Sequence, residues 1–361
     1  MNILHISPNF NYSCGVSSYV YKYLRYFGSR KDYNLYFITN GGDALSRLDK
    51  LKDVQITLCK FSTGIRNVFY SINFYKFLIK YCINNNIDII HSHHRFPEYV
   101  AYLVSLKINV KTVTSALSFV SGYKKLSFKS DKIISCSNSV SNMLINYFKV
   151  SDSKIFTTYH CVEEFDQINS TGINRIRREL NIGNEIKVIL YVGRINKVKG
   201  YDILINSYLK NFSYTNNIKL ILIGGIEEKS FSNKINRYYK GIIHLSPSSK
   251  YYHYYELADV VISPSRKDPF PLVMLETGIM KKPFIGSRTG GISEFIDDGV
   301  NGFLFEPGNA DDLADKIKFV INNPEKAKSA AEELHKKVKK YCNCEDYFAR
   351  LKGIYEELLE A

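Results

Sequence analysis

Short apolar segments alternate with amphipathic segments of helical length along nearly the whole chain. The segments predicted as strands are Ile3–Ile6, Leu35–Thr39, Gln55–Leu58, Ile87–His91, Lys111–Phe119, Lys132–Cys136, Val188–Val192, Leu220–Ile223, Ile242–Leu245, Val260–Ser263 and Pro283–Ile285. The segments predicted as helices are Val16–Tyr26, Val68–Asn84, Ser139–Phe148, Arg175–Leu180, Tyr252–Ala258, Ala310–Asn322 and Tyr347–Leu359. Repeated strand, loop and helix is typical of parallel sheets, because the helix supplies the crossover that parallel neighbours need. The chain is therefore predicted to be an α/β protein.

The length allows two such α/β domains. With 361 residues and 45% hydrophobic content, the chain can form two substantial cores. A polar stretch, Asp166–Asn174, has the composition of a linker between them. We therefore predict a first domain over residues 1–165 and a second domain that begins at residue 166.

Cysteine usage and the first residues indicate a protein of a reducing compartment. The seven cysteines are an odd number without a C-x-x-C pair, which predicts free thiols and neither a disulfide framework nor a zinc ribbon. The start, MNILHISP, lacks the basic region and cleavage site of a signal peptide, and no apolar run reaches the ~20 residues of a membrane span. We expect a cytoplasmic protein, either soluble or peripheral on the inner face of the plasma membrane.

Positive charge is concentrated in the first domain. The chain carries a net charge of +14, and residues 1–165 hold 20 Lys and Arg against 10 Asp and Glu. Aromatic and basic residues occur together in two predicted helices: Tyr19, Tyr21, Tyr23, Tyr26, Lys22, Arg25 and Arg30 in the first, and Arg66, Phe69, Tyr70, Phe74, Tyr75, Phe77, Lys76 and Lys80 in the second. Such helices could lie on an anionic membrane, or could be buried amphipathic helices with solvated basic faces. No nucleic-acid recognition module accompanies the charge, so specific nucleic-acid binding is not predicted.

An acidic pair, Asp268 and Glu276, flanks the most informative turn of the sequence. Pro269-Phe270-Pro271 cannot lie inside a helix, whereas a proline at the first helical position is tolerated, so a helix is predicted to start near Pro271. Asp268 would lie in the loop before the positive helix N-terminus, and Glu276 in the first two helical turns. Carboxylates placed in this way can accept hydrogen bonds from sugar hydroxyls. The alternative is an N-cap aspartate and a solvated glutamate.

Two cations lie on a second strand-to-helix connection. Arg194 and Lys199 belong to Gly193-Arg-Ile-Asn-Lys-Val-Lys-Gly200, which directly follows the predicted strand Val188–Val192. Fixed cations in such a connection can neutralise a diphosphate and stabilise it as it leaves. A run of lysines is otherwise usually solvent-facing. An earlier loop after the first strand ends at Gly15, where backbone N–H groups could approach a phosphate or a sugar.

These motifs together resemble a known family. The acidic pair followed by LE-x-G-x-x-K-x-P, GG-I-x-E and D-G-x-x-G, together with G-R-x4-K-G upstream, is similar to the nucleotide-binding half of the retaining glycosyltransferases of family 4. The resemblance implies the GT-B fold, in which two Rossmann-like β/α/β domains face a cleft. It further implies an acceptor-binding domain over residues 1–165, a nucleotide-sugar-binding domain over 166–345, and a last helix, 346–361, that packs back on the first domain.

The resemblance also implies roles for individual residues. Glu276 would hold the ribose of a nucleotide sugar, Asp268 with the backbone of Phe270 would reach the sugar ring, and Arg194 and Lys199 would bind the diphosphate. The full donor-binding set expected in this way is Gly15, Gly193, Arg194, Lys199, His244, Asp268, Phe270, Pro271, Leu272 and Glu276, and the catalytic set is Arg194, Lys199 and Asp268. The backbone around His244 resembles the loop that reads the base.

The implied activity is retaining transfer of a hexose-type sugar to a glycan or polyprenyl-linked acceptor, in cell-surface polysaccharide biosynthesis. No Asp-x-Asp is present to hold a diphosphate-bound cation, so the reaction is predicted to need neither metal nor cofactor. In the family the leaving diphosphate assists the incoming hydroxyl, and no protein nucleophile is required. Four positions depart from the family pattern: Asp268 replaces the usual glutamate, Pro271 and Cys14 replace glycines, and Ala116 replaces a histidine.

The histidines of the first domain allow two interpretations. His91 and His93 would share one face of a strand end and could bind a metal ion, but no acidic or cysteine ligand nearby completes a site. We favour a polar strand end where ligands collect in α/β folds, and predict no metal ligand. Because the segment Lys111–Phe119 has Thr114-Ser115-Ala116 where the family commonly has Thr-x-His, His93 and Ser115 are the candidates on the acceptor side.

Two other functions remain open at this point. A sugar-nucleotide epimerase of similar architecture would bind the same donor but would convert it without an acceptor. A non-catalytic partner subunit is the other alternative, because Cys14, Asp268 and Ala116 replace residues that the family usually has in its site.

Overall fold

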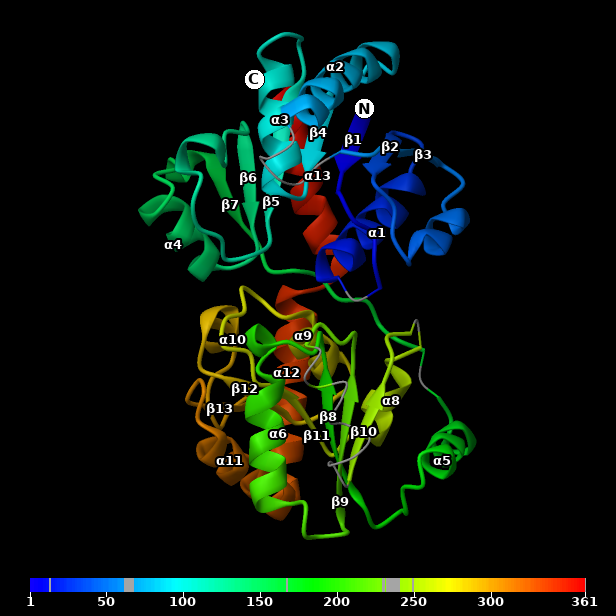
Figure 1. The fold of residues 1–361 in the computed structure, drawn as a ribbon, viewed down its shortest axis with the longest axis vertical. Coiled ribbons are helices and arrows are strands. Elements are labelled where there is room, and N and C mark those ends of the chain that lie inside the picture. Colours follow the sequence, from blue (N-terminus) through cyan, green and yellow to red (C-terminus); the bar gives the residue numbers. More distant parts are fainter. Residues whose placement is uncertain are drawn as a thin grey trace. The chain divides into compact units, whose positions relative to one another are not determined.

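The protein folds into two compact units. The computed structural model describes residues 1–12, 14–61, 68–166, 168–228, 231, 241–248 and 250–360. One unit, here the N-terminal unit, consists of Met1–His160 and Glu345–Ala361, and the other, the C-terminal unit, of Cys161–Cys344 (Figure 1). The predicted boundaries fell after residues 165 and 345.

The N-terminal unit is built on a parallel sheet. Its order is β3-β2-β1-β4-β5-β6-β7. The strands are β1 (Asn2–Ile6), β2 (Asn34–Thr39), β3 (Val54–Leu58), β4 (Ile89–Ser92), β5 (Lys111–Ala116), β6 (Lys132–Ser135) and β7 (Ile155–Thr157). The strand order reverses between β1 and β4. At such a reversal the crossovers leave in opposite directions and open a crevice at the carboxyl ends of the strands.

Helices cover both faces of this sheet. They are α1 (Gly15–Gly28), α2 (Val68–Asn84), α3 (Arg95–Ser105), α4 (Asn138–Asn146) and α13 (Cys344–Glu360). The alternation of side chains along β1 explains the two layers, since Leu4 and Ile6 join the core that also contains residues of α2 and α3, while His5 contacts the rings of α1 on the other face.

The last helix, α13, packs within the N-terminal unit, as predicted. Figure 1 shows it in red among the elements of this unit. The Tyr347 hydroxyl donates to the Tyr19 hydroxyl of α1 at 2.9 Å, and the ring of Phe348 stacks on that of Tyr26 with centroids 4.3 Å apart. Aromatic contacts of this kind bury large surfaces, so side-chain packing against α1 holds the helix in this unit.

The C-terminal unit has a second parallel sheet of order β10-β9-β8-β11-β12-β13. Its strands are β8 (Lys187–Val192), β9 (Ile218–Ile223), β10 (Ile242–Leu245), β11 (Val260–Ser263), β12 (Phe284–Ser287) and β13 (Phe303–Phe305). Ile189 and Tyr191 of β8 belong to one buried cluster, and Val188 and Leu190 belong to another. Both faces are therefore covered, which explains the continuous apolar runs in the sequence. Here the strand order reverses between β8 and β11.

Several helices of the C-terminal unit were not predicted from the sequence or were predicted with other bounds. They are α5 (Ser170–Glu179), α6 (Tyr201–Asn211), α8 (His253–Leu257), α9 (Leu272–Ile279), α10 (Gly290–Phe295), α11 (Ala310–Asn322) and α12 (Pro324–Tyr341). The predicted linker Asp166–Asn174 was wrong at its end, because the side chain of Asn169 caps a helix that starts at Ser170. The helix α12 was missed altogether, although Pro324 at its first turn is a start signal.

Candidate functional site

Two loops at the carboxyl ends of β8 and β11 form the centre of the candidate site. The loop after β8 runs to Gly200, and the loop after β11 begins at Pro264. Gly200 has φ 71°, and a Cβ on it would lie 1.8 Å from the carbonyl oxygen of Pro264. Only glycine permits this approach. The glycine thus brings together the two segments that the sequence analysis had singled out separately.

Asp268 and Lys199 form an ion pair where these loops meet. Lys199 Nζ donates to Asp268 Oδ2 at 2.7 Å, and Ser265 Oγ donates to the same oxygen at 2.9 Å. The Asp268 side chain is 2% exposed and that of Lys199 is 26% exposed. A buried carboxylate needs such compensation, because desolvation of an unpaired charge is costly. Lys199 therefore orients Asp268, while its own side chain stays partly exposed.

Arg194 is held by a different carboxylate. Its Nη1 donates to Glu227 Oε1 at 3.0 Å, while Asn196 Nδ2 donates to Glu227 Oε2 at 2.6 Å. Burial raises the pKa of Glu227, but the hydrogen bonds from Asn196 and Arg194 outweigh it and lower the pKa overall. The two predicted phosphate-binding cations thus have separate acidic partners. Glu227, which lies after β9, was not predicted from the sequence.

Glu276 lies in α9 with each carboxylate oxygen held by a tyrosine. Tyr251 donates its hydroxyl to Oε1 at 2.5 Å and Tyr255 donates to Oε2 at 2.7 Å. Glu276 is 6% exposed, so it is not the solvated glutamate of the alternative interpretation. Burial, followed by the Glu276 charge, raises the pKa of Tyr255 well above its ordinary value and keeps this hydroxyl protonated as a donor. Each carboxylate oxygen retains a further lone pair for a ligand hydroxyl.

In the segment between the two carboxylates, Phe270 and Pro271 are buried, whereas Leu272 and Val273 are half-buried. Phe270 is 3% exposed, and its ring packs edge-on against Phe295 with centroids 5.4 Å apart. Pro271 immediately precedes α9, so the helix begins at Leu272, one residue after the predicted start. A Cβ on Gly291 would lie 2.2 Å from the carbonyl oxygen of Pro269, which lets the start of α10 approach this loop closely.

The ends of β9 and β10 complete this side of the unit. His244 Nε2 lies 2.8 Å from the carbonyl oxygen of Gly224, which accepts a hydrogen bond from the ring. Gly193 donates its backbone N–H to Ile223, and a Cβ on Gly224 would lie 1.8 Å from the carbonyl oxygen of Gly193. The predicted donor-side residues Gly193 and His244 therefore belong to the ends of β8 and β10, the two strands that flank β9 in one sheet.

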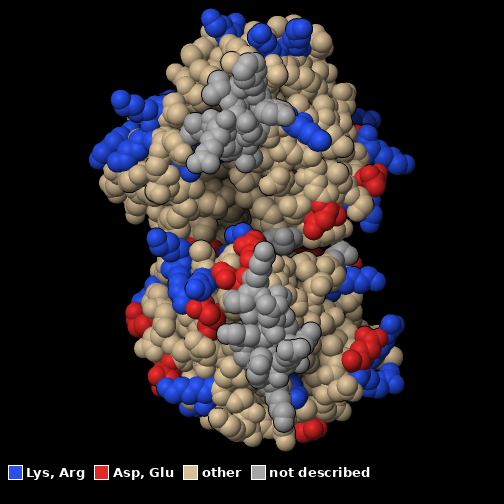
Figure 2. All heavy atoms as spheres, viewed as in Figure 1, with Lys and Arg blue, Asp and Glu red and all other residues tan. Residues whose placement is uncertain are grey.

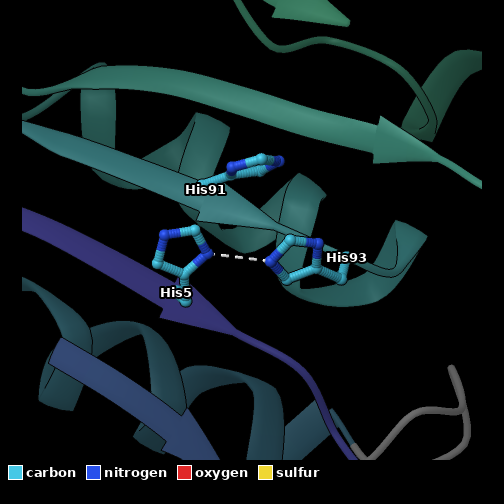
Figure 3. A group of neighbouring side chains, drawn as sticks. All are labelled: His5, His91 and His93. Atoms are coloured by element: carbon cyan, nitrogen blue, oxygen red, sulfur yellow. Dashed lines mark hydrogen bonds between the residues drawn. The ribbon is translucent and has the colours of Figure 1, made fainter. Parts of the chain in front are cut away.

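The N-terminal unit has a different chemistry at its strand ends. His5 Nδ1 and His93 Nε2 are 2.9 Å apart, and His91 lies beside them (Figure 3). His5 of β1 and His91 of β4 are register partners in the sheet, so both project from the same face. His91 and His93 were predicted from the sequence as neighbours, whereas His5 was not. Burial lowers the pKa of all three well below its ordinary value, which leaves them neutral.

The two acceptor-side candidates are committed to this internal network. Ser115 Oγ lies 2.7 Å from His91 Nε2, and His91 Nδ1 lies 2.6 Å from the Tyr355 hydroxyl of α13. His93 is 3% exposed and Ser115 is 4% exposed. Gly15, by contrast, is exposed at the first residue of α1. The preceding Ser13 lies outside the described residues.

The aromatic residues of the basic helices are largely internal. Tyr19, Tyr23 and Phe74 are 4%, 0% and 3% exposed, whereas Arg25, Lys76 and Lys80 are exposed. This supports amphipathic helices with solvated basic faces. Arg66 and the side chains of Phe69 and Tyr70 lie outside the described residues. Figure 2 shows lysine and arginine side chains with few acidic neighbours on the visible face of the N-terminal unit. Among the described residues, no helix is long and apolar enough to cross a membrane.

Comparison with known families agrees with this architecture. Residues 14–164 match Glycosyltransferase Family 4, and residues 172–337 match Glycosyl transferases group 1. An uncharacterized glycosyltransferase of Methanocaldococcus jannaschii is 30% identical over 307 residues, which cover 81% of this chain and 82% of that relative. The chain belongs to the family 4 glycosyltransferases. The predicted family is thereby confirmed.

Relatives with named activities act on different acceptors. The lipopolysaccharide 1,2-N-acetylglucosaminetransferase of Salmonella typhimurium is 29% identical over 168 residues, 42% of this chain and 44% of that protein. The N-acetyl-alpha-D-glucosaminyl L-malate synthase of Bacillus anthracis is 24% identical over 291 residues, 76% of each chain.

Solved structures confirm the GT-B fold. A glycosyltransferase from Rickettsia africae is similar with a TM-score of 0.85 and 23% identity, covering 99% of this chain and 98% of that one. Anabaena HepE, solved in complex with UDP-glucose, is similar with a TM-score of 0.84 and 17% identity, covering 99% and 100%. At these identities the likeness concerns the fold alone. The predicted two Rossmann-like units with parallel sheets are thus confirmed.

Proposed function

We propose that this glycosyltransferase moves a hexose-type sugar from a nucleotide-diphosphate sugar to a glycan or polyprenyl-linked acceptor, with retention at the anomeric carbon. The observation that carries the proposal is the pair of buried, oriented carboxylates Asp268 and Glu276 at the carboxyl edge of the β8–β11 sheet, at the strand-order reversal where α/β folds bind ligands. HepE, of the same fold, was solved with UDP-glucose, which supports this donor class.

Each residue then has a definite task. Glu276, held in one orientation by two tyrosine hydroxyls, accepts hydrogen bonds from the ribose hydroxyls with its free lone pairs. Asp268 and the backbone at Phe270 bind hydroxyls of the sugar. Lys199 and Arg194 stabilise the diphosphate, and since each has an acidic partner, the donor replaces or shares those partners.

The reaction needs no protein nucleophile. The bond between the anomeric carbon and the diphosphate oxygen breaks, and the acceptor oxygen bonds to the same face of that carbon. The proton of the acceptor hydroxyl passes to the leaving diphosphate. We propose that Lys199 and Arg194 supply the charge that a divalent cation supplies elsewhere, so that neither metal nor cofactor takes part in this step.

We propose a role in cell-surface polysaccharide biosynthesis, with the acceptor taken by the N-terminal unit. Support comes from the Salmonella relative, whose name places it in lipopolysaccharide assembly. The cationic surface of the N-terminal unit suits the diphosphate of a polyprenyl-linked acceptor at an anionic membrane.

A panel of nucleotide sugars tests the donor class by thermal shift. The true donor at 100 times its Kd should add about 2.7 kcal/mol of stability. Incubation with that donor and a polyprenyl-diphosphate glycan should give a product whose anomeric configuration, read by NMR, matches the donor. Inversion, or activity that returns only when Mg²⁺ or Mn²⁺ is added back, would contradict the mechanism. Conversion of the donor without acceptor would indicate an epimerase, and binding without transfer a partner subunit.

A further inference from the structure

Three histidines of the N-terminal unit converge at the point where the strand order of its sheet reverses. Each of His5, His91 and His93 offers a ring nitrogen, and these atoms all lie within 4.8 Å of one another (Figure 3). Register pairing of β1 with β4 places His5 beside His91, and His93 follows two residues later on the same side. Their exposed fractions are 0%, 0% and 3%, so the cluster is internal.

Hydrogen bonds alone leave this cluster incompletely satisfied. One contact joins His5 Nδ1 to His93 Nε2, but His5 Nε2 and His93 Nδ1 are buried and have no hydrogen-bond partner among the described residues. The nitrogens that an ion would join are instead the pair in contact, which can meet at 2.9 Å because one ring donates a hydrogen bond to the other. An ion bound between these rings would take the place of that shared proton. Neither the donor nor the transfer step proposed above uses these residues.

We propose that His5, His91 and His93 form a three-imidazole site for a divalent transition-metal ion of the zinc type, with a fourth position left for water. Neutral imidazole is a preferred ligand of Zn²⁺, and three histidines with one open position are a known coordination set. Ligand nitrogens about 2.0–2.1 Å from a tetrahedral ion lie about 3.4 Å apart. His5 and His93 would therefore separate slightly from 2.9 Å, and the His91 ring would move toward them.

The surroundings of His91 fit the role of a metal ligand. Its two nitrogens contact the hydroxyls of Tyr355 and Ser115, so whichever nitrogen turns to the ion, the other keeps a hydroxyl partner that orients the ring. The ion would join β1 to β4 and, where the Tyr355 contact is kept, would also fix α13. This site is separate from the proposed donor-binding residues, all but Gly15 of which lie in the C-terminal unit.

Metal titration of untagged, chelator-treated protein tests the proposal. We expect wild type to bind one Co²⁺ or Zn²⁺ per chain, with the visible absorption of tetrahedral Co²⁺, and His93→Gln to bind at least tenfold more weakly. His160→Gln changes another buried histidine of the same unit and should bind like wild type. Equal affinity in wild type and His93→Gln, or no binding by wild type, overturns the site.

X-ray absorption of the zinc-loaded wild type tests the site without any substitution, so the result does not depend on whether a variant folds. Three imidazole nitrogens in the coordination shell support the site. Sulfur ligands would show that the seven free cysteines bind the ion instead, and would overturn the proposal. Added zinc should also slow hydrogen exchange at β1 and β4 in wild type but not in His93→Gln.

Discussion

The two units share a sheet topology but differ in the residues at the point where the strand order reverses. Each has a parallel sheet whose strand order reverses once, between β1 and β4 in the N-terminal unit and between β8 and β11 in the C-terminal unit. At the first reversal lie neutral, buried imidazoles, and at the second lie an aspartate and a lysine in an ion pair. The sheet topology therefore determines where a ligand can bind, and a few strand-end residues determine which ligand.

We expect the largest effect on activity and stability from removing the charge of Lys199. Lys199→Ala removes the cation that we assign to the diphosphate and leaves Asp268 buried without its ionic partner. We expect kcat/KM to fall roughly 30- to 1,000-fold, which corresponds to a loss of about 2–4 kcal/mol of transition-state stabilisation. The free energy of unfolding should fall by about 3 kcal/mol.

Two further variants separate these effects of Lys199. Lys199→Met with Asp268→Asn should restore stability without activity, because no unpaired charge remains. Lys197→Ala, an exposed lysine two residues away, is the matched control and should leave both quantities unchanged. Normal turnover by a folded Lys199→Ala protein would remove this residue from the site.

Arg194 should show a smaller effect, confined to activity. Its side chain is 44% exposed and its Glu227 partner 48% exposed, so the ion pair is well solvated and contributes little to stability. Arg194→Ala should lower kcat/KM by about 2 kcal/mol, roughly 30-fold, with unfolding changed by less than about 1 kcal/mol. Urea unfolding and steady-state kinetics of the same preparation check both values. A loss of stability as large as that of Lys199→Ala would show that the two pairs are not different in kind.

The pattern of parallel strands was accessible from the sequence because burial on both faces makes each strand a continuous apolar run. The helix α12 was missed because its core face is mostly small, with Ala327, Ala330 and Ala331 where larger apolar residues would have produced a clear period. The start of α5 was missed for a local reason, the capping side chain of Asn169, which a composition-based linker assignment overlooks.

Only part of the candidate site could be predicted from the sequence. Asp268, Glu276, Lys199 and Arg194 were predicted because they belong to motifs with fixed spacing. Their partners Ser265, Glu227, Tyr251 and Tyr255, and the third histidine His5, come mostly from other segments and carry no motif. They become visible only when register and loop approach are known, as with His5 beside His91 across β1 and β4.

Acid should weaken the N-terminal unit through its buried neutral histidines. Burial, with a contribution from Lys22, lowers the pKa of His160 from 6.5 to about 3. Above pH 6.5 neither state is charged at this residue. Between pH 6.5 and 3 the unfolded chain binds a proton that the folded chain does not, so stability falls by about 1.4 kcal/mol per pH unit for this residue. His160→Gln should reduce the slope of unfolding free energy against pH by that amount between pH 6 and 4.5. An unchanged slope would contradict a neutral His160.

The smallest effect per residue is expected for the binding of basic residues to an anionic membrane. Because Arg25, Lys76 and Lys80 are exposed on α1 and α2 and Lys22 is half-buried, we expect each to contribute up to about 1 kcal/mol of attraction to an anionic bilayer. Changing all four to Gln should abolish cosedimentation with anionic liposomes at low salt while nucleotide-sugar binding stays intact. The matched control removes the same charge from the C-terminal unit, at the exposed Lys210, Lys281, Lys318 and Lys336, and should still cosediment. If both variants bind liposomes as wild type does, the surface charge of the N-terminal unit does not select a membrane acceptor, and a soluble glycan becomes the better candidate.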